Sequence, residues 1–175
     1  MLNIDRVTYR IAGRTLLEAA SAQIPAGRRV GLVGRNGSGK STLLALIRGE
    51  LQTDAGEISI EKRARMGFVA QEAPGGDTTA LEHVLASDTE RTQLWREVEP
   101  DADPERMAEA HARLFEIDAH TAPARAASIL AGLGFDTERQ SRPLREFSGG
   151  WRMRVGLAAV LFSAPDLLLL DEPTN

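Results

Sequence analysis

The sequence predicts one α/β domain with antiparallel β-strands at its start, a mainly parallel core sheet and an inserted α-helical subdomain. Short runs of apolar and β-branched residues recur near both ends of the chain, as strands require. A glycine-rich loop stands between one such run and a helical pattern, and the middle third carries apolar residues at helical spacing. At 175 residues, the chain is long enough for one domain with a substantial core.

The composition excludes several classes of protein. A net charge of −4 gives no overall basic field, so no specific DNA partner and no anionic membrane surface is indicated. The absence of cysteine excludes disulfides and thiolate metal sites, and it suits a reducing compartment. The apolar runs are far shorter than the roughly 20 residues of a membrane helix. We therefore expect a cytoplasmic chain without a membrane partner.

The first 70 residues predict five strands and one helix. Alternation of apolar and polar residues indicates the antiparallel strands at the start, and turn-rich stretches separate the later ones. The helix is expected at Ser41–Ile47, where apolar residues occur on nearly every side. The strands are expected at Leu2–Val7, Leu17–Ile24, Arg29–Val33, Glu57–Ile60 and Met66–Val69.

The middle of the chain predicts a helical hairpin. Thr79 and Glu82 form a capping box at the start of one long helix that continues to Glu99. Asp103 is suited to cap a second helix that has Pro104 at its first position. The apolar spacing of both helices places one seam between them.

The remaining pattern completes a single domain over residues 1–175. A third helix is expected at about Pro123–Leu133, a fourth at Ser148–Phe162 and a buried strand at Leu167–Leu170. We assign the core to residues 1–77 and 135–175 and a helical subdomain to about 78–134. Within that subdomain, a hairpin arm covers about 90–119.

Gly34–Ser41 fits the pattern G-x-x-x-x-G-K-[ST] between a strand and a helix, which an incidental glycine-rich turn would lack. Backbone N–H groups of such a loop point inward, and the helix N-terminus adds positive potential for phosphates. Lys40 is expected to reach the β- and γ-phosphates, and Ser41 is expected to bind Mg²⁺. The expected nucleotide contacts are Gly34, Arg35, Asn36, Gly37, Ser38, Gly39, Lys40, Ser41 and Thr42.

Leu167–Leu170 is followed by two carboxylates, Asp171 and Glu172, as in a Walker B segment. Asp171 is expected in the Mg²⁺ shell, and Glu172 is expected to orient or deprotonate the attacking water. A buried strand that ends in solvated acids is the alternative. The phosphate loop elsewhere in the chain favours the catalytic interpretation.

Phe147–Arg154 resembles the signature motif of ATP-binding-cassette (ABC) proteins. Ser148, Gly149 and Gly150 begin a helix whose free N–H groups form an anion site. In the resembled family this motif meets the γ-phosphate of ATP held by a different cassette. The resemblance therefore implies ATP sandwiched between two cassettes.

The same resemblance assigns two further contacts. Gln71 stands where the family has its Q-loop glutamine, which touches Mg²⁺ or the water. The family stacks an aromatic residue on adenine near the position of Ile11, and Tyr9 is two residues away. Tyr9 is the aromatic candidate and Ile11 the apolar one, while a strand-edge tyrosine without a ligand is the alternative.

Three features resemble the ABC-F branch: the continuation of the signature as Gly150–Arg154, the Glu172–Asn175 segment and the hairpin inserted near Glu90–Ala119. The resemblance covers the chain as the N-terminal part of a first cassette. It implies an ATPase that regulates translation on the ribosome, with a second cassette on the same polypeptide. The alternatives are a transporter ATPase subunit, a cytosolic ABC protein that acts on nucleic acid without the ribosome, and a hairpin without a partner.

Two expectations concern what this chain needs from outside itself: a facing cassette and a partner for the hairpin. Lys40, Gln71 and Glu172 belong to one ATP site and Ser148–Gly150 to the facing site, so these 175 residues alone are expected to be inactive in hydrolysis. The hairpin between Asp88 and Asp118 is strongly acidic. Since acidic surfaces repel phosphate, we expect it to meet a basic ribosomal protein rather than RNA backbone.

Overall fold

The computed structural model describes residues 2–62, 64–69, 73–98 and 103–171. These residues form two compact units. The residues up to Met66, together with Pro165–Asp171, form a unit that we call the sheet unit. Gly67–Ala164 form the second, which we call the helical unit.

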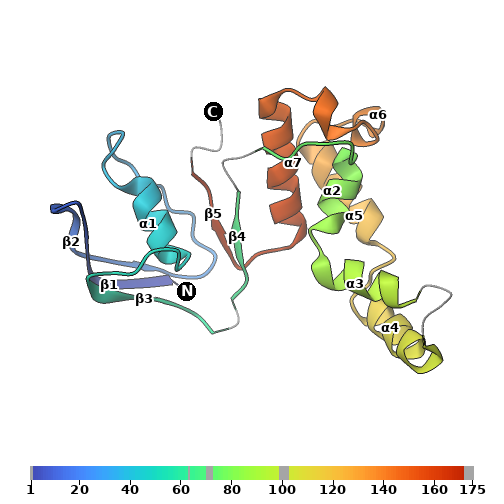
Figure 1. Cartoon of the computed structure of the whole chain (residues 1–175), viewed down its shortest axis with the longest axis horizontal. Coiled ribbons are helices and arrows are strands. Elements are labelled where there is room, and N and C mark those ends of the chain that lie inside the picture. The colour runs from blue at the N-terminus through green and yellow to red at the C-terminus, as the bar shows by residue number, and fades with distance from the viewer. Residues whose placement is uncertain (1, 63, 70–72, 99–102, 172–175) are drawn as a thin grey trace. The chain divides into compact units, whose positions relative to one another are not determined.

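Three strands of the sheet unit form an antiparallel sheet in the order β2-β1-β3 (Figure 1). They are β1 (Leu2–Ile11), β2 (Arg14–Ile24) and β3 (Ala55–Ile60). The predicted antiparallel start of the chain is confirmed, and each strand is longer than expected.

A bulge in β1 sets which of its residues are buried. The register shifts between Ile4 and Val7, and Arg6 between them has a positive φ of 46°. The shift keeps Val7 on the buried side, whereas strict alternation would have placed Arg6 there. Gly56 lies against this bulge, because a Cβ on it would come within 2.3 Å of the Arg6 carbonyl oxygen.

The predicted strand at Arg29–Val33 is wrong. None of the described strands pairs with this segment, which has no regular structure. Val30 and Val33 are 64% and 94% exposed. A β-branched run favours an extended backbone, but a strand also needs a neighbour that supplies ladder hydrogen bonds.

Strands β4 (Met66–Phe68) and β5 (Leu167–Leu169) form a two-stranded sheet at the expected positions. The Arg65 carbonyl accepts hydrogen bonds from the N–H groups of Asp166 at 2.8 Å and Leu167 at 3.1 Å. Because the residues just before both strands meet there, the strands run parallel. This two-stranded sheet is the parallel sheet of the described residues, and it is separate from the antiparallel one.

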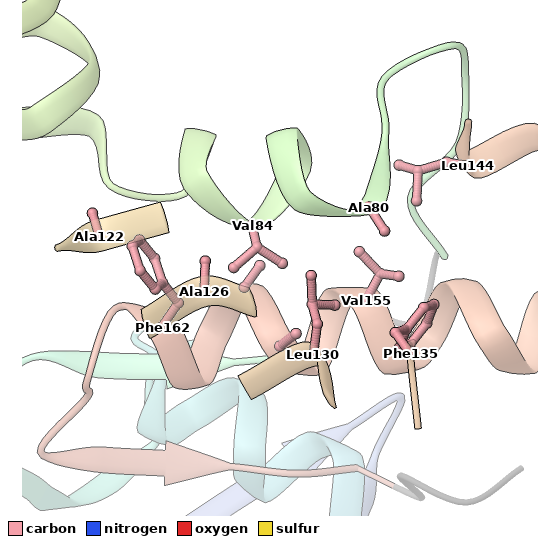
Figure 2. Close-up of a cluster of buried hydrophobic side chains, with 11 residues drawn as sticks. Ala80, Val84, Ala122, Ala126, Leu130, Phe135, Leu144, Val155 and Phe162 are labelled. Carbon is pink, nitrogen blue, oxygen red and sulfur yellow. The ribbon is translucent and has the colours of Figure 1, made fainter. Parts of the chain in front are cut away.

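The helical unit buries one apolar core among α2, α5 and α7. Figure 2 shows Val84, Leu130 and Val155 from these three helices meeting in it. The described helices of this unit are α2 (Ala80–Ala86), α3 (Thr89–Glu97), α4 (Pro104–Glu116), α5 (Ala122–Gly132), α6 (Thr137–Gln140), the 3₁₀ turn η1 (Leu144–Glu146) and α7 (Gly149–Phe162).

The predicted single helix from Thr79 to Glu99 is wrong, because it is two helices within the described residues. The Ser87 hydroxyl donates to the carbonyls of Val84 at 2.7 Å and Ala159 at 3.1 Å. Asp88 then caps α3 by accepting from the Arg91 N–H at 2.9 Å. Ser and Asp offer the backbone hydrogen bonds that compete with a continuing helix, so the pair forms a boundary.

The hairpin arm is present as α3 and α4. Asp103 caps α4 with Pro104 at its first position, as predicted. Arg113 of α4 joins the two helices through an ion pair with Glu90 at 2.7 Å, and it also binds Glu116 at 2.9 Å. No helix in the described residues is long and apolar enough to cross a membrane.

We expect Leu130→Ala to destabilise the chain by about 3 kcal/mol, because Leu130 is fully buried in the α2–α5–α7 core and its truncation leaves a cavity. Urea unfolding followed by circular dichroism measures this loss. Phe115→Ala is the matched control, because this α4 side chain is 81% exposed and its truncation should change stability by less than about 0.5 kcal/mol. Equal effects of the two variants would contradict the assignment of the core.

Candidate functional site

The phosphate loop depends on two glycines with left-handed backbone conformations. Gly37 has a φ of 76°, and Gly39, the N-cap of α1 (Lys40–Ile47), has a φ of 96°. Residues with a Cβ rarely adopt these values, so glycine is needed at both positions. The Ser38 N–H donates to the Arg35 carbonyl at 3.1 Å and closes the turn between them.

Lys40 folds back over this loop. Its ammonium donates to the carbonyl oxygens of Gly34 at 3.0 Å and Arg35 at 3.2 Å. Gly34 allows the close approach of the loop to itself, because a Cβ there would lie 2.5 Å from the Ser38 hydroxyl oxygen. The arrangement holds one positive charge beside the uncapped N-terminus of α1, where potential is already positive.

The two candidates for the adenine contact lie on β1, which pairs with the strand that touches the loop. A Cβ on Gly39 would be 3.7 Å from the Leu16 Cβ of β2, so β2 lies beside the loop. Across the hairpin, Tyr9 pairs with Leu17, and Ile11 pairs with Arg14. Tyr9 is partly buried and Ile11 is 52% exposed. Their contact with adenine stays a prediction.

Asp171 belongs to the same sheet unit as the phosphate loop. Arg48, the C-cap of α1, has a raised pKa chiefly because Glu50 accepts its hydrogen bonds, and the negative charge of Asp171 adds to this rise. Asp171 therefore lies close enough to the end of α1 for a charge interaction. Gln71 and Glu172 lie outside the described residues.

A magnesium site in this unit would draw on Ser41 and Asp171. Ser41 is exposed in the first turn of α1. A hydroxyl and a carboxylate are hard oxygen ligands, which suits Mg²⁺, whose remaining positions are usually filled by phosphate oxygens and waters. The described residues contain no cluster of three metal-ligating side chains, and such a shared site does not require one.

The signature residues begin α7 in the helical unit. Ser148 is the N-cap, with φ −63° and ψ 161°, but its side chain caps no backbone N–H. Gly149 and Gly150 are exposed, and a Cβ on either would meet nothing within 4 Å. The first backbone N–H groups of α7 are thus open to an anion from outside the unit.

One structural connection could not be recognised in the sequence. The residues that follow Gln71 are joined to those that precede the signature: the Leu144 N–H donates to the Thr78 carbonyl at 2.9 Å, and the Arg145 N–H donates to the Gly76 carbonyl at 3.0 Å. Asp77 and Arg145 also form an ion pair. Hydrogen bonds between segments so far apart leave no local sequence pattern, so neither segment alone predicts them.

The same segment packs along α7. A Cβ on Gly75 would lie 3.3 Å from an Nη of Arg152, and a Cβ on Gly156 would lie 3.6 Å from the Pro74 Cδ. The Arg152 Nε is buried without a hydrogen-bond partner in the described part of the chain. Residues 74–75 therefore pack near the start of the signature helix but form no hydrogen bond with the Arg152 Nε.

The comparisons with known proteins agree with these motifs. The family model described as ABC transporter matches residues 17–175. "Probable ATP-binding protein YheS" of Escherichia coli K12 is 45% identical over all of this chain, which covers 28% of that protein. Human "ATP-binding cassette sub-family F member 3" is 45% identical over 99% of this chain, which covers 25% of it. This chain thus spans about a quarter of the length of these relatives.

The fold is also that of solved cassettes. A dimeric bacterial ABC transporter cassette matches 99% of this chain with a TM-score of 0.66 and 24% identity, and this chain covers 75% of it. A nucleotide-free cassette from an ABC transporter has a TM-score of 0.67 and 22% identity, with 99% of this chain and 69% of that one covered. The chain therefore belongs to the ATP-binding-cassette family, in its ABC-F branch, and corresponds to the N-terminal part of the first cassette of those proteins.

Proposed function

We propose that this chain binds ATP with Mg²⁺ through the phosphate loop Gly34–Ser41. The observation that carries the proposal is the position of the Lys40 ammonium over a loop built on left-handed glycines, at the uncapped start of α1. Backbone N–H groups and the lysine together offer the positive environment that a triphosphate needs. The magnesium ion would neutralise phosphate charge, with Ser41, Asp171 and Gln71 as its protein ligands.

We also propose that each ATP site is completed by a second cassette, which the full-length protein carries on the same polypeptide. Ser148–Gly150 present open N–H groups in the helical unit, whereas the phosphate loop belongs to the sheet unit. This supports a contact of Ser148–Gly150 with nucleotide that is held by another cassette. Hydrolysis would then need Glu172 beside the attacking water and the signature helix of the facing cassette. The 175 residues alone are expected to bind nucleotide weakly and to show negligible turnover.

The proposed cellular role is regulation of translation on the ribosome in the cytoplasm. The support is the ABC-F relationship together with the α3–α4 arm inserted in the helical unit. A transporter ATPase subunit and a cytosolic ABC protein that acts on nucleic acid without the ribosome are the alternatives.

The arm offers a surface for a basic protein partner. Arg113 offsets the charge of Glu90 and Glu116 by ion pairs, but acidic side chains outnumber arginines along the arm. Because phosphate would be repelled, a lysine- and arginine-rich ribosomal protein is the favoured partner. The described acidic residues are Asp88, Glu90, Glu97, Asp103, Glu105, Glu109, Glu116 and Asp118, against Arg91, Arg96, Arg106 and Arg113.

We expect Lys40→Ala to weaken ATP binding at least tenfold, because it removes the ammonium that lies over the phosphate loop. Isothermal titration of the full-length protein with Mg-ATP measures the affinity. Lys62→Ala is the matched control, since Lys62 is an exposed lysine outside the loop and its loss should leave the affinity within twofold. The proposed ATP site is wrong if Lys40→Ala binds as tightly as the unchanged protein.

The full-length protein should sediment with ribosomes in the presence of a non-hydrolysable ATP analogue. Glu109→Lys on the arm is expected to reduce this binding severalfold, because it removes attraction to a basic partner. Glu57→Lys, an equal charge change on exposed β3, should have no effect. Sedimentation with membranes would favour a transporter subunit, and crosslinks from the arm mainly to RNA phosphates would contradict the choice of a protein partner.

A further inference from the structure

We propose that Trp151 is a positioning residue that holds the first turn of the signature helix in place for the facing nucleotide. The inference rests on the proposed function, because it assigns a task to the helix that begins with Ser148. Trp151 is the third residue of α7 and directly follows Gly149 and Gly150. The contacts that carry the proposal all lie within the helical unit.

The indole packs edge-on against the unit's core. Its ring centroid lies 4.9 Å from that of Phe135, with an interplanar angle of 85°. Phe135 is fully buried and makes a second edge contact with Phe147, at 5.5 Å. Edge-to-face pairs at these distances are the favoured arrangement of aromatic rings. Trp151 is thus joined to a side chain that is itself fixed.

The indole also lies on the turn that ends α5. A Cβ on Gly134 would be 3.6 Å from the Trp151 Cη2, and Gly134 has a φ of 92°, which favours glycine there. The turn therefore exposes bare backbone to the indole. This contact connects the start of α7 to the segment between α5 and α6.

Two guanidinium groups lie over the indole. The Cζ atoms of Arg139 and Arg154 are 5.0 Å and 4.7 Å from the ring centroid, within the range of cation–π attraction. Arg139 is held in turn, because it donates to the Gly134 carbonyl at 3.3 Å and pairs with Asp136 at 3.8 Å. We call Trp151, Phe135, Phe147, Arg139 and Arg154 the Trp151 cluster.

Apart from the packing of Gly75 on Arg152 and the hydrogen bonds between residues 76–78 and 144–145, the first turn of α7 has no other anchor than Trp151 among the contacts described above. Gly149 and Gly150 have no side chains, and Ser148 is exposed without a cap hydrogen bond. Their N–H groups are the ones proposed to meet phosphate, so their aim depends on how the next residue is anchored. Since Trp151 supplies that anchor, its loss should misplace these N–H groups and leave the phosphate loop Gly34–Ser41 unchanged.

The test uses ATP hydrolysis by the full-length protein. We expect Trp151→Ala to lower kcat about tenfold while ATP affinity at the phosphate loop stays within twofold, because edge contacts and cation–π contacts are each worth a factor of roughly 2 to 10. Trp151→Phe should recover at least a third of kcat, since a ring remains against Phe135. This separation of kcat from affinity, with rescue by Phe, is what a positioning role predicts.

Arg125→Ala is the matched control. Arg125 stacks on Phe162 at 4.6 Å, which is the same kind of contact at the other end of α7. Its removal should leave kcat within twofold. Should Trp151→Ala not fold, the double variant Arg139→Ala/Arg154→Ala removes both cations from the indole and is expected to lower kcat about threefold.

The outcomes separate the two proposals. An unchanged protein that neither binds nor hydrolyses ATP would overturn the proposed function itself. If the unchanged protein hydrolyses ATP and folded Trp151→Ala keeps its kcat, the positioning role is wrong. A kcat loss no larger than that of Leu130→Ala at equal loss of stability would also overturn it, because it would reflect the core alone.

Discussion

Unsatisfied backbone N–H groups at helix N-termini are the constraint around which this chain is organised. Side chains cap α2, α3, α4 and α6, through Thr79, Asp88, Asp103 and Asp136. The proposed ligand-binding helices α1 and α7 lack such caps in the described structure. Helix α5 also lacks a side-chain cap, but Pro123 in its first turn has no N–H, so one donor fewer needs a partner. The uncapped, glycine-led starts are thus those that the motifs assign to phosphate.

The phosphate loop and the start of the signature helix are held by different means. The phosphate loop depends on local backbone conformation, because Gly37, Gly39 and the Lys40 hydrogen bonds lie within a few residues of one another. The start of α7 depends on side chains from several segments, with Phe135 and Arg139 around Trp151. A glycine substitution would therefore damage the phosphate loop directly, whereas changes in distant segments of the helical unit can affect the start of α7.

This difference explains how much the sequence could predict. Capping patterns and the phosphate loop act over three to eight residues, so Thr79 with Glu82, Asp103 with Pro104, and Gly34–Ser41 could be recognised without a fold. The strand expected at Arg29–Val33 failed because pairing depends on a neighbour that no local pattern supplies. The helix boundary at Ser87 was not predicted, because the Ser87 hydroxyl donates to the carbonyl of Ala159, which is far away in the chain.

The segment after Gln71 is attached to the helical unit both before and after the signature residues Ser148–Gly150. Residues 76–80 bond to residues 142–145, and Gly75 and Pro74 lie along α7 at Arg152 and Gly156. Glycine at 75 and 156 keeps this packing close, since a side chain at 75 would crowd the guanidinium. A displacement of the segment would therefore act on both the turn before Ser148 and the body of α7. The first turn of α7 lies between these two places, the turn before Ser148 and the body of α7. Because Trp151 fixes this first turn, the turn would move with the helical unit and would not bend separately.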